Sequence, residues 1–500
     1  MSSRRTAGLW LACVAAALAG CGADEGAPED ADVGFADAGR IDAGAADAGR
    51  VDAGRVDAGR VDAVVADAVV ADAVVADAVV ADAVVADAVV ADAVAADAGA
   101  TPGGPVLYPA TRTQSPMTDA VVAGLRAVAA RRRRDDAVVA KVGASNTVNS
   151  NFLHCFAGTN VELGGRDALR ATLDFYRAGR VMGASAFTRT SLAATVGWSA
   201  WSALQGVPSP LQREVDATDA RVAVVMFGTN DIQAQNWHRY GQNLWDIADT
   251  LSAQGVVTVM TSVPPRDDSA TADAWVPRYV AIMRAVAQSR QLPFVDLERE
   301  LRALPDHGLG PDGIHMNALP SGARACAFTP AGLRYGFNQR NLLTLEALHR
   351  VRQALGGAAP DAEAPALHLT GAGTAASPFV VPALPFSDAR DTRAGGERRI
   401  DRYPGCNSAA DESGPEFVYA LTVTEPTPVY AMVIVRGTTD IELHHLRGAT
   451  VDGAACAARD DRVLSLTLSP GTHRFVLDTY AVNGAPRAGE YLFVLVRGGV

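Results

Sequence analysis

Three short strings in this chain carry side chains that together could cleave an ester. In chain order they are Val142-Gly143-Ala144-Ser145-Asn146, Gly228-Thr229-Asn230-Asp231 and Asp312-Gly313-Ile314-His315. A serine hydroxyl attacks an acyl carbon only when a base, a group that orients the base and a donor to the oxyanion are present. Ser145 could attack, and His315 could take its proton. Asp312, three residues before His315, could orient the imidazole, while the Asn230 amide could donate to the oxyanion.

Apolar runs that read as buried strands lead into two of these strings. Residues 137–142 lead to Ser145, and residues 222–227 lead to Asn230. Further strand-like runs at 256–261 and 293–297 alternate with helical patterns at 236–254 and 280–290. Continuous apolar runs separated by helices predict a parallel sheet that is covered on both faces. Because active sites of such sheets form at the carboxyl ends of the strands, we expect Ser145 and Asn230 to share one edge.

The order of the strings and their local sequences resemble the SGNH (GDSL-type) hydrolase family. This resemblance implies a flavodoxin-like three-layer α/β fold over residues 105–355 and hydrolysis through an acyl-serine. It implies no metal and no organic cofactor. It also implies that the Asn230 side chain and the Ser145 backbone N–H both donate to the oxyanion.

Members of this family carry a second characteristic sequence segment, or second block, between the serine and the asparagine strings. In it, the backbone N–H of a glycine supplies a further oxyanion donor. The region 187–198 should contain this donor, and no Asn-x-Gly string occurs there. Gly197 is our candidate, with the backbone of Thr190 or Ser191 as alternatives. Ala144 stands where the family usually has an aspartate. That aspartate neither attacks nor transfers protons, so its absence affects the expected stability of the turn and the rate of the reaction.

The first hundred residues read as a leader and a spacer. Arg4 and Arg5 precede an apolar stretch at 9–19, which is typical of a secretory signal. The string Leu18-Ala19-Gly20-Cys21 resembles a bacterial lipobox and implies lipidation of Cys21; the alternative is an ordinary signal. The repeated Asp-Ala-Val-Val-Ala unit that follows has a period of five, which matches neither a helix nor a strand. We therefore predict an exported protein, tethered by lipid to the outer membrane of a Gram-negative bacterium.

The charge of the chain is concentrated in that spacer. Residues 22–100 hold 18 acidic residues and 4 arginines, whereas residues 101–500 hold 38 acidic and 38 basic residues. The part that should fold is therefore neutral, and we predict no nucleic-acid partner.

Four cysteines lie outside the leader. Cys155 and Cys326 fall in the middle region, and Cys406 and Cys456 fall in the last. Because an exported chain meets an oxidising compartment, we favour one disulfide within each region, with four buried thiols as the alternative. No C-x-x-C string or clustered His/Cys spacing occurs, so no metal site is predicted. The pair His444-His445 is expected at the surface.

The last region predicts an all-β sandwich. Short runs rich in β-branched and aromatic residues, separated by turn-forming stretches, cover 417–423, 429–435, 463–468, 473–478 and 491–496. The strings Glu416-Phe417-Val418-Tyr419, Thr439-Asp440-Ile441-Glu442-Leu443 and Ala488-Gly489-Glu490-Tyr491 resemble those of pre-peptidase C-terminal domains, which are small jelly rolls appended to secreted bacterial hydrolases. The predicted organisation is a leader over 1–21, a repeat linker over 22–104, the hydrolase-like domain over 105–355, a linker over 356–366 and the sandwich over 367–500.

These observations predict an exported serine esterase. Its expected substrate is an acylated carbohydrate, such as an acetylated polysaccharide or cell-wall glycan. Two alternatives stay open: a lipid esterase or thioesterase, and a non-catalytic surface binding protein built on a hydrolase scaffold.

Overall fold

The computed structural model describes residues 104–357 and 365–498. The predicted leader and nearly all of the predicted repeat linker, as well as Cys21, lie outside the described residues. All described residues belong to one compact unit of the chain. Within this part of the chain, no helix combines the length and apolar character needed to cross a bilayer.

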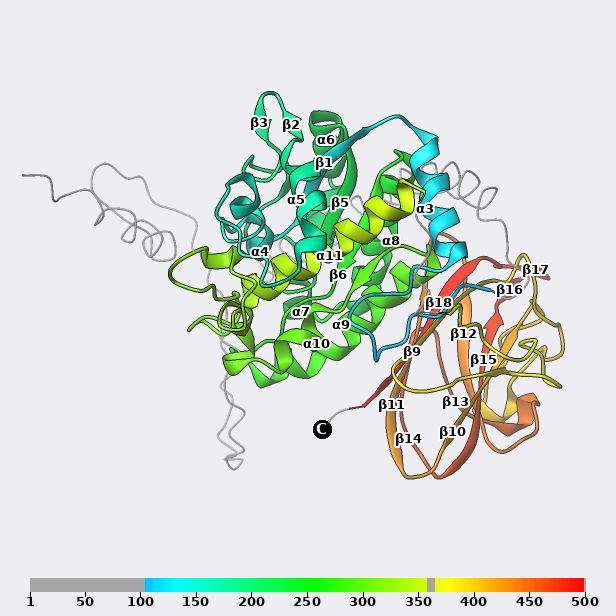
Figure 1. The fold of residues 1–500 in the computed structure, drawn as a ribbon. Helices are drawn as coiled ribbons and strands as arrows, with labels where there is room; N and C mark the ends of the chain where they lie inside the picture. The colour runs from blue at the N-terminus through cyan, green and yellow to red at the C-terminus, as the bar shows by residue number, and fades with distance from the viewer. Residues whose placement is uncertain (1–103, 358–364, 499–500) are drawn as a thin grey trace, which may run out of the picture. The chain divides into compact units, whose positions relative to one another are not determined.

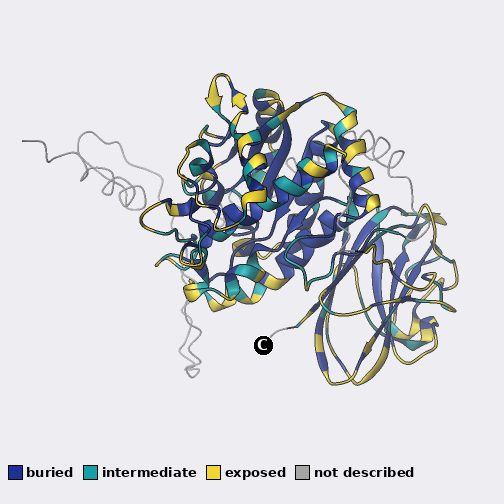
Figure 2. Ribbon diagram, viewed as in Figure 1, coloured by how far each residue is buried: buried dark blue, intermediate teal, exposed yellow. Residues whose placement is uncertain are grey.

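A five-stranded parallel sheet forms the centre of the first half (Figure 1). Its order is β4-β1-β5-β6-β7, with bounds β1 Asp135–Gly143, β4 Ala193–Ala194, β5 Ala220–Met226, β6 Val257–Thr261 and β7 Phe294–Val295. Every residue of β5 is buried, as expected for a strand covered on both faces (Figure 2). The order matches the flavodoxin-like pattern, whose ligand crevice lies beyond the strand pair at the switch point, here β1 and β5. The predicted fold class is therefore confirmed.

Helices connect these strands. Their bounds are α3 Asp119–Arg131, α4 Ser145–Val148, α5 Arg170–Arg177, α6 Pro210–Thr218, α7 Asp231–Ala234, α8 Trp237–Ala253, α9 Ala270–Ser289, α10 Leu297–Arg302 and α11 Gly336–Leu355. Two short strands, β2 Arg180–Val181 and β3 Ala184–Ser185, form a hairpin. The helix predicted at 280–290 is the second half of α9. It begins ten residues earlier because the Ser269 side chain caps it by accepting the Ala272 N–H, and Pro277 is accommodated inside it.

The second half consists of two mainly antiparallel sheets, as predicted. One has the order β13-β12-β15-β10-β8, and the other has the order β14-β11-β18-β9. Their bounds are β8 Phe379–Val380, β9 Phe386–Asp391, β10 Phe417–Val423, β11 Thr427–Val435, β12 Ile441–Leu446, β13 Cys456–Asp460, β14 Val463–Leu468, β15 Gly471–Thr479 and β18 Glu490–Arg497, with a small hairpin of β16 Ala481–Val482 and β17 Ala485–Pro486. All five apolar runs identified in the sequence lie within these strands.

The sandwich shares a core with helices of the α/β half. Ile434 of β11 and Leu492 of β18 belong to the same buried cluster as the α8 and α9 side chains. Gly241 lets β11 approach α8, because a Cβ there would lie 2.6 Å from the Ile434 side chain. Arg290 at the end of α9 pairs with both Asp249 and Glu490 across this contact. The α/β half and the sandwich therefore pack together through both apolar and charged side chains.

The prediction that His444-His445 lies at the surface is wrong. His444 is fully buried and His445 is nearly so; both lie in β12, an inner strand of its sheet. The outer face of this sheet is covered by a second small core that includes Ile400 and Tyr403. The His444 imidazole is therefore enclosed between the sheet and this cover, where it stacks on Tyr403. His445 projects from the opposite face and contacts Phe475 of the sandwich core.

Candidate active site

The structure joins three of the predicted site residues by consecutive side-chain hydrogen bonds. The Oγ of Ser145 lies 2.8 Å from Nε2 of His315, and Nδ1 of His315 lies 2.6 Å from Oδ2 of Asp312. A hydroxyl, an imidazole and a carboxylate in this order can activate the serine as a nucleophile. Their catalytic roles stay a prediction, but their mutual geometry is the one that those roles require.

Asp312 is held in place by its own turn. Its Oδ1 accepts the backbone N–H groups of Ile314 at 3.0 Å and His315 at 2.9 Å, which leaves Oδ2 for the imidazole. Partial burial acts to raise the pKa of Asp312, but these backbone donors and the His315 ring outweigh it and hold the pKa below its ordinary value. Gly313 is required in this turn, because it has a φ of 65° and a Cβ there would lie 2.6 Å from the Asp268 nitrogen. The carboxylate therefore stays ionised beside the imidazole.

The end of β1 presents Ser145 at the edge of the sheet. Gly143 pairs with Met226 of β5, and Ser145 begins α4 two residues later. A Cβ at Gly143 would lie 2.4 Å from the Thr147 hydroxyl and 2.6 Å from the Met226 carbonyl oxygen. Glycine at this position therefore lets the Thr147 side chain and the Met226 carbonyl oxygen lie close against the end of β1.

Two residues to which the sequence analysis gave no role join the segment of Ser145 to the segment of His315. Asn146 Oδ1 accepts the Met316 N–H at 3.1 Å, which joins the segment after the serine to the segment after the histidine. Arg340 of α11 donates to the Asn146 carbonyl at 2.7 Å and to the Thr147 hydroxyl at 3.0 Å. Arg340 is fully buried, and this burial lowers its pKa to about 9. Asn146 adjoins the predicted nucleophile, whereas nothing in the sequence signals Arg340.

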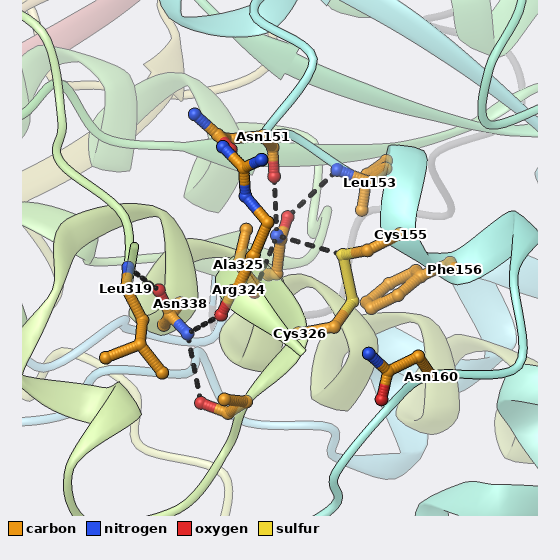
Figure 3. The surroundings of a disulfide bond; sticks show 12 residues. Asn151, Leu153, Cys155, Phe156, Asn160, Leu319, Arg324, Ala325, Cys326 and Asn338 are labelled. Carbon is orange, nitrogen blue, oxygen red and sulfur yellow. Dashed lines mark hydrogen bonds between the residues drawn. A yellow bond between two sulfur atoms is a disulfide. The ribbon is translucent and has the colours of Figure 1, made fainter. Parts of the chain in front are cut away.

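A disulfide joins the same two segments farther from the reaction centre. Cys155 follows Ser145 by ten residues, and Cys326 follows His315 by eleven; the two form a bridge as predicted (Figure 3). Asn341 of α11 donates to carbonyl oxygens on both sides of it, Asn151 at 2.8 Å and Ala325 at 3.1 Å. The second predicted pair, Cys406 and Cys456, is also bridged.

Asn230 lies just past the end of β5, as predicted, and one N–H of its side chain is already used. Its Nδ2 donates to the Trp198 carbonyl oxygen at 2.8 Å. An amide nitrogen carries two hydrogens, so one remains for an oxyanion. The neighbouring Asp231 carboxylate accepts the Ala200 N–H at 3.0 Å, which fixes the segment that carries Trp198. Burial raises the pKa of Asp231 to about 6.

The region expected to supply a further oxyanion donor lies beside the nucleophile strand. Ala193 of β4 pairs with Val142 of β1, and Gly197 follows β4 as an exposed residue with a φ of 81°. The alternative Ser191 lies before β4, where its hydroxyl donates to the Lys141 carbonyl oxygen. The order along the sheet favours Gly197 over Ser191, and the assignment of Gly197 stays a prediction.

A cavity of about 510 Å³ lies beside Asp312. Its lining consists of Asp267, Asp268, Asp306, Leu309, Gly310, Pro311, Asp312, Gly313 and Asn317. Three of these carboxylates have partners: Asp312 pairs with His315, Asp267 with Nδ1 of His307 at 2.7 Å, and Asp268 with Arg266. Four of the nine lining residues are aspartates, and the polar and apolar parts of the lining are about equal.

Comparisons with known proteins agree with this chemistry. Residues 157–319 match the model of the GDSL-like Lipase/Acylhydrolase family, a range that includes Asn230, Asp312 and His315 but begins after Ser145. No curated protein sequence matches the chain.

Among solved structures, a catalytic mutant of an acetylxylan esterase from Geobacillus stearothermophilus aligns at 13% identity and a TM-score of 0.28, over 42% of this chain and 93% of its own. A GDSL-like lipase from Bacteroides thetaiotaomicron aligns at 15% identity and a TM-score of 0.27, over 46% and 98%. A peptidoglycan O-acetylesterase aligns at 16% identity and a TM-score of 0.25, over 32% and 46%. These are distant resemblances in backbone only. The family match shows that the chain carries a GDSL-like lipase/acylhydrolase domain, the domain of an ester-hydrolysing enzyme.

Proposed function

We propose that this chain is an exported serine esterase that removes a short acyl group from a carbohydrate ester through an acyl-Ser145 intermediate. The observation that carries the proposal is the continuous hydrogen-bonded chain from Ser145 through His315 to Asp312. Ser145 and His315 are 170 residues apart in sequence, so a local turn does not account for their alignment. A catalytic role is the simplest explanation.

The mechanism follows from the positions of the protons. As Ser145 Oγ attacks the acyl carbon, its proton passes to Nε2 of His315, and the Asp312 carboxylate stabilises the imidazolium. The free N–H of Asn230 and the backbone N–H groups of Ser145 and Gly197 are the donors that we assign to the oxyanion. Collapse of the tetrahedral intermediate breaks the bond to the alcohol oxygen, which takes the proton from His315. Water then repeats the sequence, and the acid leaves with Ser145 restored.

The aspartates that line the cavity support a hydroxyl-rich alcohol portion. A carboxylate such as that of Asp306 can accept hydrogen bonds from sugar hydroxyls, whereas a long acyl chain requires a predominantly apolar lining. Trp201 adds an aromatic ring just after residues 187–198, and 47% of its surface is exposed. An exposed tryptophan can stack on a sugar ring. Trp237, in contrast, is buried in the core.

Export and lipid anchoring rest on the sequence of the leader. Arg4 and Arg5, the apolar stretch and the lipobox-like string support cleavage before Cys21. Two disulfides also fit an oxidising compartment. Metabolic labelling with a fatty-acid analogue should mark the wild-type protein and leave Cys21→Ser unmarked. Equal labelling of both would contradict the anchor.

A substrate panel tests the enzymatic proposal. Purified wild-type protein should hydrolyse an aryl acetate and release acetate from acetylated xylan, with much weaker activity on an aryl decanoate. Ser145→Ala should abolish these activities, and Ser150→Ala, at an exposed serine five residues later, should leave them unchanged. Preference for the decanoate would favour the lipid esterase, and a folded wild-type protein without hydrolysis would favour the binding protein.

A further inference from the structure

Three side chains of metal-ligating types meet inside the sandwich, away from the triad. One ligand atom from each of Glu412, Glu442 and His444 lies within 4.8 Å of the others. Nε2 of His444 lies 4.0 Å from Oε1 of Glu412 and 4.0 Å from Oε2 of Glu442. Glu442 and His444 are two residues apart in β12 and therefore project from the same face, while Glu412 approaches from the segment before β10.

The polar atoms of this cluster are buried and lack hydrogen-bond partners. Glu412 and His444 are fully buried, and both oxygens of Glu412 and Nε2 of His444 have no partner among the described residues. Glu442 Oε2 has Arg459 Nη2 at 2.5 Å as an ion pair. A buried carboxylate without a hydrogen bond or a cation is strongly unfavourable, so a group that satisfies these atoms together is expected.

The surroundings of His444 direct one nitrogen into the cluster. The Tyr403 ring stacks on the imidazole with centroids 3.5 Å apart and an interplanar angle of 7°. The Tyr403 hydroxyl is anchored in turn by donating to Asp478 at 2.6 Å. Nδ1 of His444 faces the Cys456 sulfur at 4.0 Å, which leaves Nε2 facing the carboxylates. This is the arrangement of an imidazole ligand whose orientation is fixed from outside.

We propose that Glu412, Glu442 and His444 bind one divalent transition-metal ion, with Zn²⁺ as the ion that fits the donors best. Two carboxylates and a neutral imidazole carry two negative charges; Arg459 offsets part of the charge of Glu442, and a divalent cation would balance the rest. Imidazole and carboxylate are both ordinary zinc ligands, whereas Ca²⁺ and Mg²⁺ prefer sites built from oxygen alone. Three protein ligands leave one position for water or another donor.

The present distances require only a small adjustment. Tetrahedral zinc with bonds of about 2.0–2.1 Å places its donors about 3.4 Å apart, so each 4.0 Å edge must shorten by about 0.6 Å. Glu412 can rotate to achieve this without losing a hydrogen bond, because neither of its oxygens makes one. The competing occupant is a proton shared between Glu412 and Glu442, and a metal titration separates the two.

The experiment uses the full chain, stripped with a chelator and titrated with Zn²⁺ against a chromophoric competitor. Wild type should bind one tight equivalent, and its thermal midpoint should rise with stoichiometric zinc. Glu412→Gln removes a ligand and should lower the affinity by at least about 100-fold, since even outer partners of metal ligands contribute 10–100-fold. Glu416→Gln is the matched control, because Glu416 is a buried glutamate of the same sandwich outside the cluster.

Two results would overturn the proposal: no tight equivalent in wild type, or equal affinity in wild type and Glu412→Gln. X-ray absorption of the zinc-loaded wild type decides the matter without any variant. One imidazole among oxygen ligands supports the site. Two imidazoles would place the ion at the pair His445 and His473, whose ring nitrogens lie 3.0 Å apart, and would contradict the proposal.

Discussion

Replacing Asn230 by alanine removes the side-chain donor that we assign to the oxyanion. The amide uses one N–H for the Trp198 carbonyl oxygen and keeps the other for the tetrahedral intermediate. Loss of one such donor lowers kcat by about 10²–10³-fold, which corresponds to about 2.7–4 kcal/mol of transition-state stabilisation. KM should change much less, because the ground-state carbonyl needs this donor less. Loss of the hydrogen bond to Trp198 should also cost about 1 kcal/mol of unfolding free energy.

The chain offers a matched control six residues later. Asn236 also precedes a helix, and its Oδ1 accepts the Arg239 N–H at 3.1 Å as an N-cap of α8. Asn236→Ala should cost about 1 kcal/mol of stability and leave turnover intact. Steady-state kinetics on an aryl acetate and thermal midpoints of both variants form one data set. If Asn230→Ala behaved like Asn236→Ala, destabilised but with near-normal kcat, the oxyanion assignment would be refuted.

Three further substitutions test the neighbouring groups. Asp312→Asn keeps the backbone hydrogen bonds but favours the wrong tautomer of His315, so kcat should fall by about 10⁴-fold in steady-state assays while the thermal midpoint changes little. Asp231, whose folded-state pKa is about 6 against 3.8 when exposed, binds a proton more readily in the folded state. Its contribution to stability is therefore lost as pH rises from 3.8 to 6. Denaturant titrations should show the unfolding free energy of the wild type falling by about 3 kcal/mol relative to that of Asp231→Asn across this pH range. Equal pH dependence of the two unfolding free energies would contradict this. Arg340→Lys keeps the charge but not the forked donor pair, and should lower kcat at least about tenfold with little change in KM; unchanged kcat would show that this clamp has no catalytic consequence.

Local patterns in the sequence were enough to predict the sheet and the placement of the reacting groups. Continuous apolar runs identified β1 and β5, and the rule that sites form at carboxyl ends placed Ser145 and Asn230 together. The triad partner His315 needed the family resemblance, because an Asp-x-x-His string alone is common. The disulfides followed from the compartment and the region in which each cysteine lies.

Contacts between segments distant in sequence were not predictable in the same way. Arg340 contacts the residue after the nucleophile from a helix 194 positions away, and a lone arginine in a helix normally indicates a solvated face. His444 was expected at the surface because it belongs to a lone histidine pair in a strand-like run. Its face of β12 is not exposed. The segment containing Tyr403 covers that face, and no periodicity reveals such a cover.

The most direct test of the central claim is the site of covalent labelling by a fluorophosphonate probe. The hydrogen-bonded chain to His315 and Asp312 should make the Ser145 hydroxyl reactive. Intact-mass measurement and peptide mapping of the wild-type protein should find one label per chain, located on Ser145, with ester hydrolysis lost in proportion to labelling. A label on another serine, or full hydrolysis with Ser145 replaced by alanine, would contradict the account.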